Sequence, residues 1–455
     1  MNSPHVIVIG AGFSGLVAAR ELQTAGISCE IVEARDRIGG RAWTDDRMGL
    51  PLEMGATWVH WFQPYIWSEV TRYNQGIHTS PADNQAYWVT QGEVHTAPEA
   101  EADEKMMPAL DIIYKHSDEF FPNPHDPLAI LREEFGADPA QVEEFKAFDH
   151  KSVMDILEEA GVEQELQDMV EGFWAAAYIG EPRAGSSLMA KQWAALSDHS
   201  HKLVDEINLR YKLDNGMRGI YEAIREDLRC PVHLETPVTK VEHGDSGVRV
   251  TLESGEVKEA SAVICTVPLG ALGNIEFDPA LPEEQQRVID ARWNSEGAKI
   301  WIKIKGHHRI IGYAGSDKPM SLIRSEYFLE DDNGEKTTVL VGFGANHNNV
   351  DINDVADAQR IMDTWDLDVE AVDCTGHDWV KDKWTQQAWA TLRKGQFIDG
   401  WSHFINSDSA LHFAGADFAP GWRGVVVDGA LQSGIMTARR VINRLRAAKA
   451  LPKAA

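Results

Sequence analysis

The stretch HVIVIGAGFSGLVAARELQTAG at residues 5–26 decides how this chain begins to fold. Its first five residues form an apolar run of strand length, and this run ends directly at a glycine. Apolar residues then recur at helical spacing until Gly26, which is a common helix stop signal. The stretch ISCEIV at 27–32 has the composition of a second strand, and Glu33 follows it. The sequence therefore predicts a strand–helix–strand unit, the start of an α/β fold.

The turn between the first strand and the helix has the spacing GxGxxG, at Gly10, Gly12 and Gly15. Such glycines permit a tight turn and let a pyrophosphate approach the helix N-terminus, whose dipole favours an anion. An acid at the end of the next strand, here Glu33, can accept hydrogen bonds from both hydroxyls of a ribose. The alternative is a structural glycine turn beside a surface glutamate, but the combined context favours a dinucleotide-binding site.

The charge balance excludes some classes of partner. The chain has 455 residues, long enough for two domains, and its 71 acidic and 43 basic residues give a net charge of −28. This field repels phosphate backbones and anionic membranes, so we expect no nucleic-acid and no membrane partner. The field attracts small cations, and amines are cations at neutral pH. The alternative is that the charge serves solubility alone.

Cysteine and histidine patterns give no support for a metal. The four cysteines are far apart, and none of the histidines has HExxH spacing. The first strand begins at His5, which leaves no room for a signal peptide, and no apolar run reaches the about eighteen residues that span a bilayer. We therefore expect a cytoplasmic protein. Its assembly state is left open, with a homodimer as one option.

The stretch EARDRIGGR at residues 33–41 resembles the flavin amine oxidase (monoamine oxidase-like) family. In that family the glycine pair lets the backbone approach FAD, and the following arginine, here Arg41, holds the pyrophosphate. The resemblance extends over nearly the whole chain and indicates FAD rather than NAD. It implies an α/β fold, in which a Rossmann-like FAD-binding domain is interleaved with an α+β substrate-binding domain.

The domain boundaries follow from changes in composition along the chain. We expect the FAD-binding domain at residues 1–80, 215–275 and 396–455. The substrate-binding domain is expected at 81–214, which is acidic and largely helical, and at 276–395, which contains a sheet.

Further motifs carry the resemblance. EMGATW at residues 53–58 is similar to the family's segment along the flavin, and Val238 matches the strand that holds the adenine. FAGAD at 413–417 is similar to the stretch near the ribityl chain. VDGA at 427–430 matches the start of the C-terminal helix, whose positive end stabilises reduced flavin. The resemblance implies that FAD is bound by Gly10, Gly12, Ser14, Gly15, Glu33, Arg35, Gly40, Arg41, Gly55, Ala56, Thr57, Trp58, Val238, Trp379, Gly415, Asp417 and Val427.

Two positions are implied to act in catalysis. Lys299 lies in an alternating strand at 298–306, and by pattern alone it shares a polar surface with Lys303 and Lys305. The family has a lysine here that holds a water molecule against flavin N5. Trp389 matches the first wall of the aromatic cage that flanks the amine.

The rest of the cage differs from the family pattern. Ala388 stands where members with covalently attached flavin have a cysteine, so FAD is expected to bind without a covalent bond. The second cage aromatic should fall near Val425 or Val426, where none is present. We expect the pocket beside Trp389 to be poor in charge and to prefer a ring or branched group near the nitrogen. With GATWVHWFQPYIW at 55–67, this half-cage is most similar to the bacterial nicotine and cyclic-amine oxidases.

The resemblance implies an FAD-dependent amine oxidase. A neutral amine, cyclic or aryl-substituted, would pass a hydride from its α-carbon to flavin N5, and the resulting imine would hydrolyse. O2 or another acceptor would reoxidise the flavin. Two alternatives stay open. One is a flavin-dependent C–C desaturase or dehydrogenase, although no apolar entrance loop is evident. The other is an inert FAD-binding partner protein, against which Lys299 and the aromatic segment argue.

Overall fold

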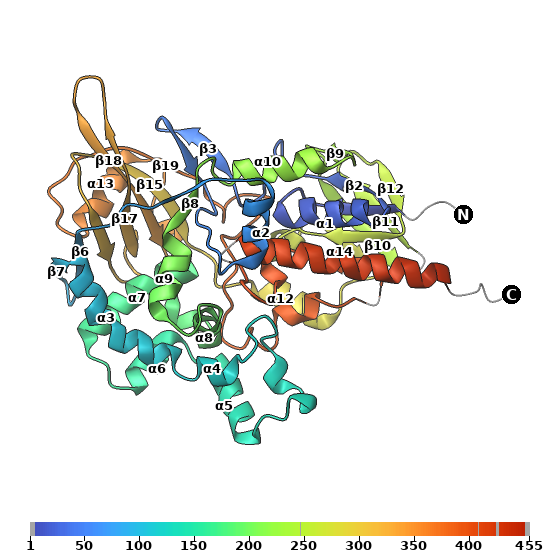
Figure 1. Cartoon of the computed structure of the whole chain (residues 1–455), viewed down its shortest axis with the longest axis horizontal. Helices are drawn as coiled ribbons and strands as arrows, with labels where there is room; N and C mark the ends of the chain where they lie inside the picture. The colour runs from blue at the N-terminus through green and yellow to red at the C-terminus, as the bar shows by residue number, and fades with distance from the viewer. Residues whose placement is uncertain (1–4, 246, 408, 425–426, 451–455) are drawn as a thin grey trace.

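The first sheet contains the predicted strand–helix–strand unit. The computed structural model describes residues 5–245, 247–407, 409–424 and 427–450. The sheet is parallel and five-stranded, with β1 between β2 and β13 (Figure 1). In spatial order its strands are β20 (Leu411–Phe413), β13 (Ala262–Cys265), β1 (His5–Ile9), β2 (Ser28–Val32) and β9 (Val232–His233).

Two helices from opposite ends of the chain pack together beside this sheet. The N-terminal α1 (Phe13–Thr24) and the C-terminal α14 (Val427–Ala450) lie side by side (Figure 1). Gly434 makes this close approach possible, because a Cβ atom there would lie 2.3 Å from the Ser14 carbonyl oxygen. The start of α14 is thereby held close to the start of α1.

A second, four-stranded sheet adjoins the first. Residue Val238 begins its strand β10, which pairs antiparallel with β11 and parallel with β14. In spatial order the strands are β12 (Val257–Ala260), β11 (Gly247–Leu252), β10 (Val238–Gly244) and β14 (Glu276–Asp278).

The largest sheet has seven strands and is antiparallel except for the parallel pair β16 and β6. Its strands are β19 (Ala371–Gly376), β15 (Ala298–Lys305), β18 (Lys336–Gly344), β17 (Leu322–Glu330), β16 (Ile310–Tyr313), β6 (Gln85–Thr90) and β7 (Glu93–Pro98). Two small ribbons pair β3 (Thr44–Arg47) with β4 (Leu50–Glu53), and β5 (Ile77–Thr79) with β8 (Tyr211–Leu213).

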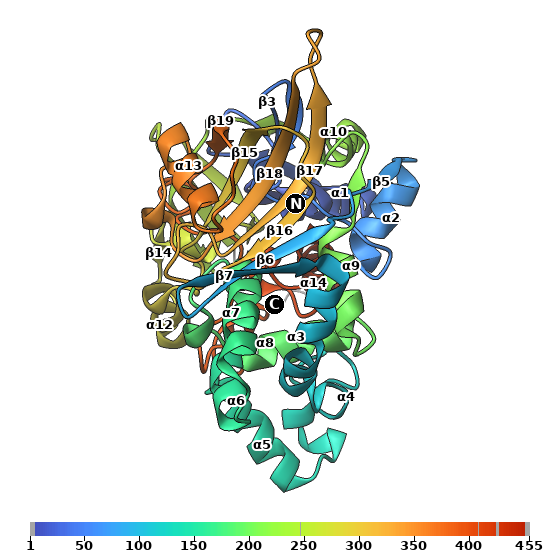
Figure 2. The same cartoon turned by 90° about the vertical axis from the view of Figure 1, so that its left-hand side faces the viewer.

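The helices of residues 99–209 lie below or beside the seven-stranded sheet (Figure 2). These are α3 (Glu99–Tyr114), α4 (Ser117–Phe120), α5 (Pro139–Asp149), α6 (Val153–Glu159), α7 (Gln164–Tyr178), α8 (Ser187–Leu196) and α9 (His201–Leu209). The others are α2 (Pro64–Arg72), α10 (Arg218–Asp227), α11 (Leu269–Leu272), α12 (Glu283–Ala291) and α13 (Val355–Asp363). In the part of the chain that the structure describes, no helix is long and apolar enough to cross a membrane.

The structure differs from the sequence prediction at the start of the segment 81–214. This segment was expected to be largely helical, and it does contain α3 to α9, but it begins with the hairpin β6–β7. Ala86, Trp88 and Thr90 are buried on one face of β6, and Gln91 and Gly92 form the turn. The hairpin joins the seven-stranded sheet, whose other strands come from 276–395. The division into two interleaved domains stays a prediction.

Candidate active site

A long cavity runs between the five-stranded sheet and the seven-stranded sheet. Its empty volume, including the part open to solvent, is about 1480 Å³. Its lining extends from the glycine-rich turn to Lys299 and Trp389. Of the residues predicted to bind FAD, it is lined by Gly10, Gly12, Ser14, Glu33, Arg35, Gly40, Arg41, Gly55, Ala56, Val238, Trp379, Gly415, Asp417 and Val427.

The glycine-rich turn leaves the start of α1 open towards this cavity. Gly12 precedes the helix, and no side chain caps its first N–H groups. The Ser14 hydroxyl is buried without a hydrogen-bond partner among the described residues. Free N–H groups and an unpaired hydroxyl at a helix N-terminus suit a phosphate group. Gly15 does not line the cavity. A Cβ atom there would lie 2.0 Å from the Gly10 carbonyl oxygen, so Gly15 makes the turn possible.

Glu33 is held in place before any ligand binds. Its two carboxylate oxygens accept hydrogen bonds from the backbone N–H groups of Ala11 (2.6 Å) and Arg35 (2.9 Å). Burial raises the pKa of Glu33, and these two hydrogen bonds oppose that rise. Each oxygen has a further lone pair, and the side chain lines the cavity. The geometry therefore fits the ribose-binding role that the sequence predicts.

The two predicted arginines are both tied to carboxylates. Arg35 donates two hydrogen bonds to Asp382, at 2.7 and 2.9 Å. Arg41 donates to the Ala388 carbonyl oxygen at 2.8 Å and to Asp417. Asp417 is fully buried and also accepts from the Leu269 N–H at 3.0 Å. These ion pairs fix both guanidinium groups at the wall of the cavity, where they can meet a pyrophosphate.

Lys299 is buried at the end of the same cavity. Its Nζ donates to the carbonyl oxygens of Glu53 and Gly55, both at 2.8 Å, and to Thr57 Oγ1 at 2.6 Å. Burial lowers the pKa of Lys299, and the nearby Glu53 carboxylate opposes that shift. The alternating pattern alone predicted a polar surface shared with Lys303. Instead Lys299 is only 3% exposed, because β15 lies inside the sheet between β18 and β19.

A second cavity adjoins the first. Its empty volume is about 800 Å³, and Gly55, Ala56 and Trp389 line both cavities. Thr57 and Trp58 line the second cavity and not the first, so the structure does not place them in the predicted FAD site. The remaining lining residues are Phe173, Ala176, Ala177, Trp193, Val204, Asp205, Asn208, Leu209, Leu322 and Phe343.

Trp389 has a fixed orientation at the boundary of the two cavities. Its indole N–H donates to the Ala177 carbonyl oxygen at 3.0 Å, and its ring meets the edge of Phe343 with the ring centres 5.8 Å apart. Trp58 contacts Phe343 from another side, at 6.1 Å. The predicted single aromatic wall is thus part of a larger aromatic surface. The positions of the second cage aromatic, Val425 and Val426, lie outside the described residues.

The pocket beside Trp389 was expected to be poor in charge, and Asp205 of α9 is the one ionisable residue among the described residues that line the second cavity. Asp205, Phe343, Trp193 and Asn208 were not predicted from the sequence as site residues. The pattern within α9 could have shown that Asp205 and Asn208 share one helix face. Nothing in the local sequence could have shown that this face meets Trp389, which is far away along the chain.

The sequence matches the model of the family described as flavin containing amine oxidoreductase over residues 13–442. The chain therefore belongs to this family. A pseudooxynicotine dehydrogenase from a Pseudomonas species is 32% identical over 444 residues, which are 97% of this chain and 86% of the relative. A nicotine dehydrogenase from Pseudomonas putida is 29% identical over 442 residues, covering 96% and 88% of the two chains. The structure of cyclohexylamine oxidase from Brevibacterium oxydans has a similar fold, with a TM-score of 0.75, 20% identity and coverage of 98% and 100%.

These findings confirm the predicted family, fold class and enzyme class. The protein is a flavin-dependent amine oxidoreductase, and the family implies FAD as its cofactor. The first cavity fits that cofactor: it joins an uncapped helix N-terminus, an unpaired Ser14 hydroxyl and the preset carboxylate of Glu33.

Proposed function

We propose that this protein binds FAD in the first cavity without a covalent bond, and oxidises a cyclic or aryl-substituted amine in the second. The observation that carries the proposal is that the two cavities meet at Gly55, Ala56 and Trp389, with Lys299 at the wall of the first. FAD, when bound, accepts a hydride at its N5 atom. An amine in the second cavity would lie next to the wall of the first.

The side chains around the second cavity position the amine and exclude water. Trp389, Phe343 and Trp58 form a rigid aromatic surface, since both indole N–H groups have hydrogen-bond partners at 3.0 Å. Such a surface suits an aromatic or cyclic substituent. The named activity of the Pseudomonas putida relative supports this substrate class, because nicotine combines a cyclic amine with an aromatic ring. Orientation and desolvation are the main contributions expected from the protein.

Lys299 is proposed to hold a water molecule or exchange a proton beside the flavin. The charged ammonium group donates all three of its hydrogen bonds to Glu53, Gly55 and Thr57. Burial lowers its pKa, which favours the neutral amine. A neutral amine has a lone pair that can accept a proton from a neighbouring water. O2 or another acceptor would then take the electrons. A cytoplasmic location and a homodimer stay sequence predictions.

A simple experiment tests how FAD is attached. Among the described residues that line the first cavity, none is a cysteine, histidine or tyrosine, and Ala388 offers no thiol. Acid precipitation of the purified yellow protein should therefore release all of the flavin into the supernatant. Flavin that stays with the protein pellet would show a covalent bond.

The substrate class is tested by anaerobic reduction of the flavin in the holoenzyme. We expect nicotine and 1-methyl-2-phenylpyrrolidine to bleach the flavin faster than putrescine and cadaverine, because the linear diamines leave the aromatic surface uncovered. Absorbance in a stopped-flow instrument measures these rates. Faster bleaching by the linear diamines would contradict the proposed class. Bleaching by an alkene-forming substrate alone would favour a C–C dehydrogenase.

A further inference from the structure

The second cavity is lined mainly by apolar residues, and among its described lining residues α9 supplies the polar side chains of Asp205 and Asn208. Val204 and Ile207 pack into the core, with exposed fractions of 2% and 0%. Asp205 and Asn208 are three residues apart, so they project from the same side of the helix, and both line the cavity. Neither residue lines the first cavity. The polar part of the second cavity is therefore separate from its boundary with the flavin site.

Asp205 carries a free carboxyl group in this cavity. Among the described residues that line the second cavity, it is the only ionisable one. Its side chain is exposed, and in the part of the chain that the structure describes it makes no hydrogen bond or ion pair. Although the residue as a whole is exposed, the surrounding protein restricts the hydration of its carboxyl group and so raises the pKa of Asp205; Arg324 opposes that shift, and Glu206 adds to it. A carboxyl group with this environment would gain from a cationic partner.

Asn208 adds an unpaired acceptor one turn further along the helix. Its amide nitrogen donates to the Val204 carbonyl oxygen at 2.7 Å. Its Oδ1 atom is buried and has no hydrogen-bond partner among the described residues. Most buried polar atoms in proteins have a hydrogen-bond partner, so this acceptor oxygen would gain from a donor. Asp205 and Asn208 thus both line the second cavity, and each has an acceptor oxygen without a partner among the described residues.

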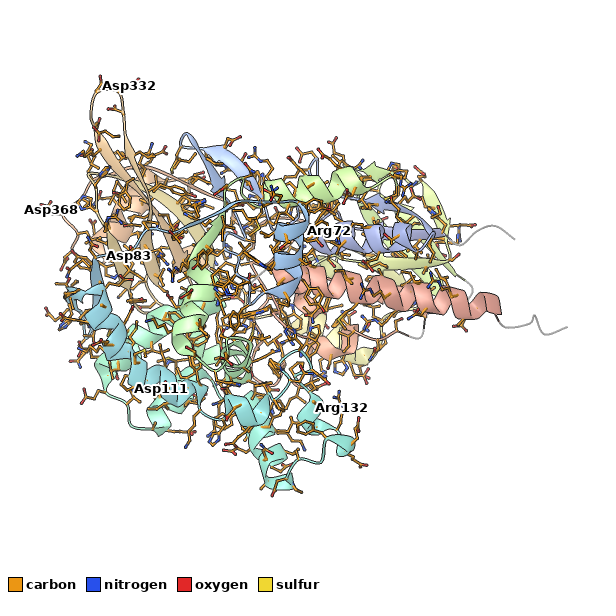
Figure 3. The ribbon with its side chains drawn as sticks, in the orientation of Figure 1. Arg72, Asp83, Asp111, Arg132, Asp332 and Asp368 are labelled. Atoms are coloured by element: carbon orange, nitrogen blue, oxygen red, sulfur yellow. The ribbon has the colours of Figure 1, made fainter. Side chains whose placement is uncertain are left out.

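The surroundings of Asp205 are acidic. Glu99 and Asp103 of α3 face it, and repulsion among these groups together with restricted hydration raises the pKa of Asp103 to about 7. The charge of Arg324, which opposes these pKa shifts, is already shared with Asp83 (3.5 Å) and Glu326 (3.3 Å). Asp83 lies just before β6 and is labelled in Figure 3. A positive charge beside Asp205 would therefore reduce the mutual repulsion of these carboxylates.

We propose that Asp205 and Asn208 form a second binding point, which takes a protonated nitrogen of the substrate. This inference rests on the proposed function. The preferred substrates would carry an amine that is oxidised beside Trp389 and, beyond a ring, a second nitrogen with N–H groups and a positive charge. That nitrogen would donate one hydrogen bond to the Asp205 carboxylate and one to Asn208 Oδ1.

Two matched probes test this binding point: 1-methyl-2-phenylpyrrolidine and its derivative with an aminomethyl group on the para position of the phenyl ring. The concentration dependence of flavin reduction in the holoenzyme gives a Kd for each. Because a charged hydrogen bond is worth about 1.5–3 kcal/mol, we expect at least tenfold tighter binding of the aminomethyl probe. In Asp205→Asn this preference should fall to about twofold or less, and in Asn208→Leu it should fall partly.

Glu206→Gln is the matched control. Glu206 is adjacent on α9 and has the same charge, but it does not line the cavity. This variant should keep most of the preference. Equal binding of the two probes to the wild type, or a full preference in Asp205→Asn, would overturn the proposal. An equal loss in Glu206→Gln would also overturn it, because the effect would then be one of general charge.

The proposed function and this binding point can fail separately. If neither probe reduces the flavin, a titration of the oxidised flavin absorption still measures binding. A preference that is present there and lost in Asp205→Asn would support the binding point and contradict the proposed function. Rapid reduction by both probes without any preference would support the function and contradict the binding point.

Discussion

At the scale of the residue, Lys299 shows most clearly how burial changes chemistry. An exposed lysine is charged at every physiological pH, whereas a lysine inside a sheet loses hydration and its pKa falls. The structure places Lys299 at the wall of the first cavity with three hydrogen-bond acceptors around Nζ. Its side chain can therefore be held in one position while its protonation state changes.

Replacement of Lys299 by Met should separate cofactor binding from proton handling. Met fills a similar volume without a charge, so the Lys299→Met variant should fold and bind FAD. We expect reoxidation of the reduced flavin by O2 to slow by about tenfold or more, since a positioned proton donor or acceptor is lost. Stopped-flow traces of both half-reactions measure this effect. Traces that match the wild type in both would show that Lys299 has a structural role only.

Residues whose partners are near in sequence could be predicted from the sequence. Glu33 and the glycines belong to one strand–helix–strand unit, so their spacing alone indicated that they form one dinucleotide-binding site. Asp205 and Asn208 belong to α9, which is far from Trp389 along the chain. Both residues line the same cavity as Trp389 because of how α9 packs against the rest of the protein. No local sequence pattern predicts that packing.

At the scale of the element, α14 does more than cover the five-stranded sheet. Asp428 in its first turn accepts hydrogen bonds from the N–H groups of Tyr65 (2.6 Å) and Ile66 (2.8 Å), which begin α2. The carboxylate thereby acts as a cap for a helix that is distant in sequence. Its second oxygen has no partner among the described residues, and burial raises the pKa of Asp428 to about 7.

This buried acid predicts a pH dependence of stability. The folded-state pKa of about 7 lies above the ordinary value of 3.8, so the folded protein holds a proton that the unfolded chain releases. The stabilising effect of protonation is complete below about pH 4 and is lost as the pH rises through 7. The Asp428→Asn variant has no such titration. Relative to it, the unfolding free energy of the wild type should fall by about 1.4 kcal/mol per pH unit between about pH 4 and pH 7.

Denaturant unfolding of wild type and Asp428→Asn at several pH values measures the difference in unfolding free energy. The amide introduced by this substitution keeps one carbonyl oxygen that can accept both N–H groups, so the variant should fold. A difference that stays constant from pH 4 to pH 8 would show that Asp428 is ionised throughout.

Element prediction succeeded where the pattern was local. The strand β1, the helix α1 and the strand β2 lie where the sequence placed them, because Gly10 and Gly26 separate the three segments. The hairpin β6–β7 was missed because acidic, helix-forming segments follow it and dominate the composition of 81–214. The alternation of Ala86, Trp88 and Thr90 was the available signal.

At the scale of the whole molecule, the active site lies where two sheets from alternating parts of the chain meet. The glycine-rich turn comes from the five-stranded sheet, and Lys299 comes from the seven-stranded sheet. The surface carries much of the net charge of −28, and Asp332 and Asp368 project from the outer end of the seven-stranded sheet (Figure 3). Such a field is expected to attract protonated amines, although only the neutral amine can release a hydride from its α-carbon.

The central claim is that a neutral amine in the second cavity reduces FAD in the first. Anaerobic stopped-flow reduction of the holoenzyme by 1-methyl-2-phenylpyrrolidine at pH 7 and pH 9 tests it most directly. The reactive fraction of an amine rises about tenfold per pH unit below its pKa. We therefore predict that the flavin bleaches at both pH values and that the rate constant increases strongly from pH 7 to pH 9. The account would be contradicted if no amine reduced the flavin at either pH while an alkene-forming substrate did.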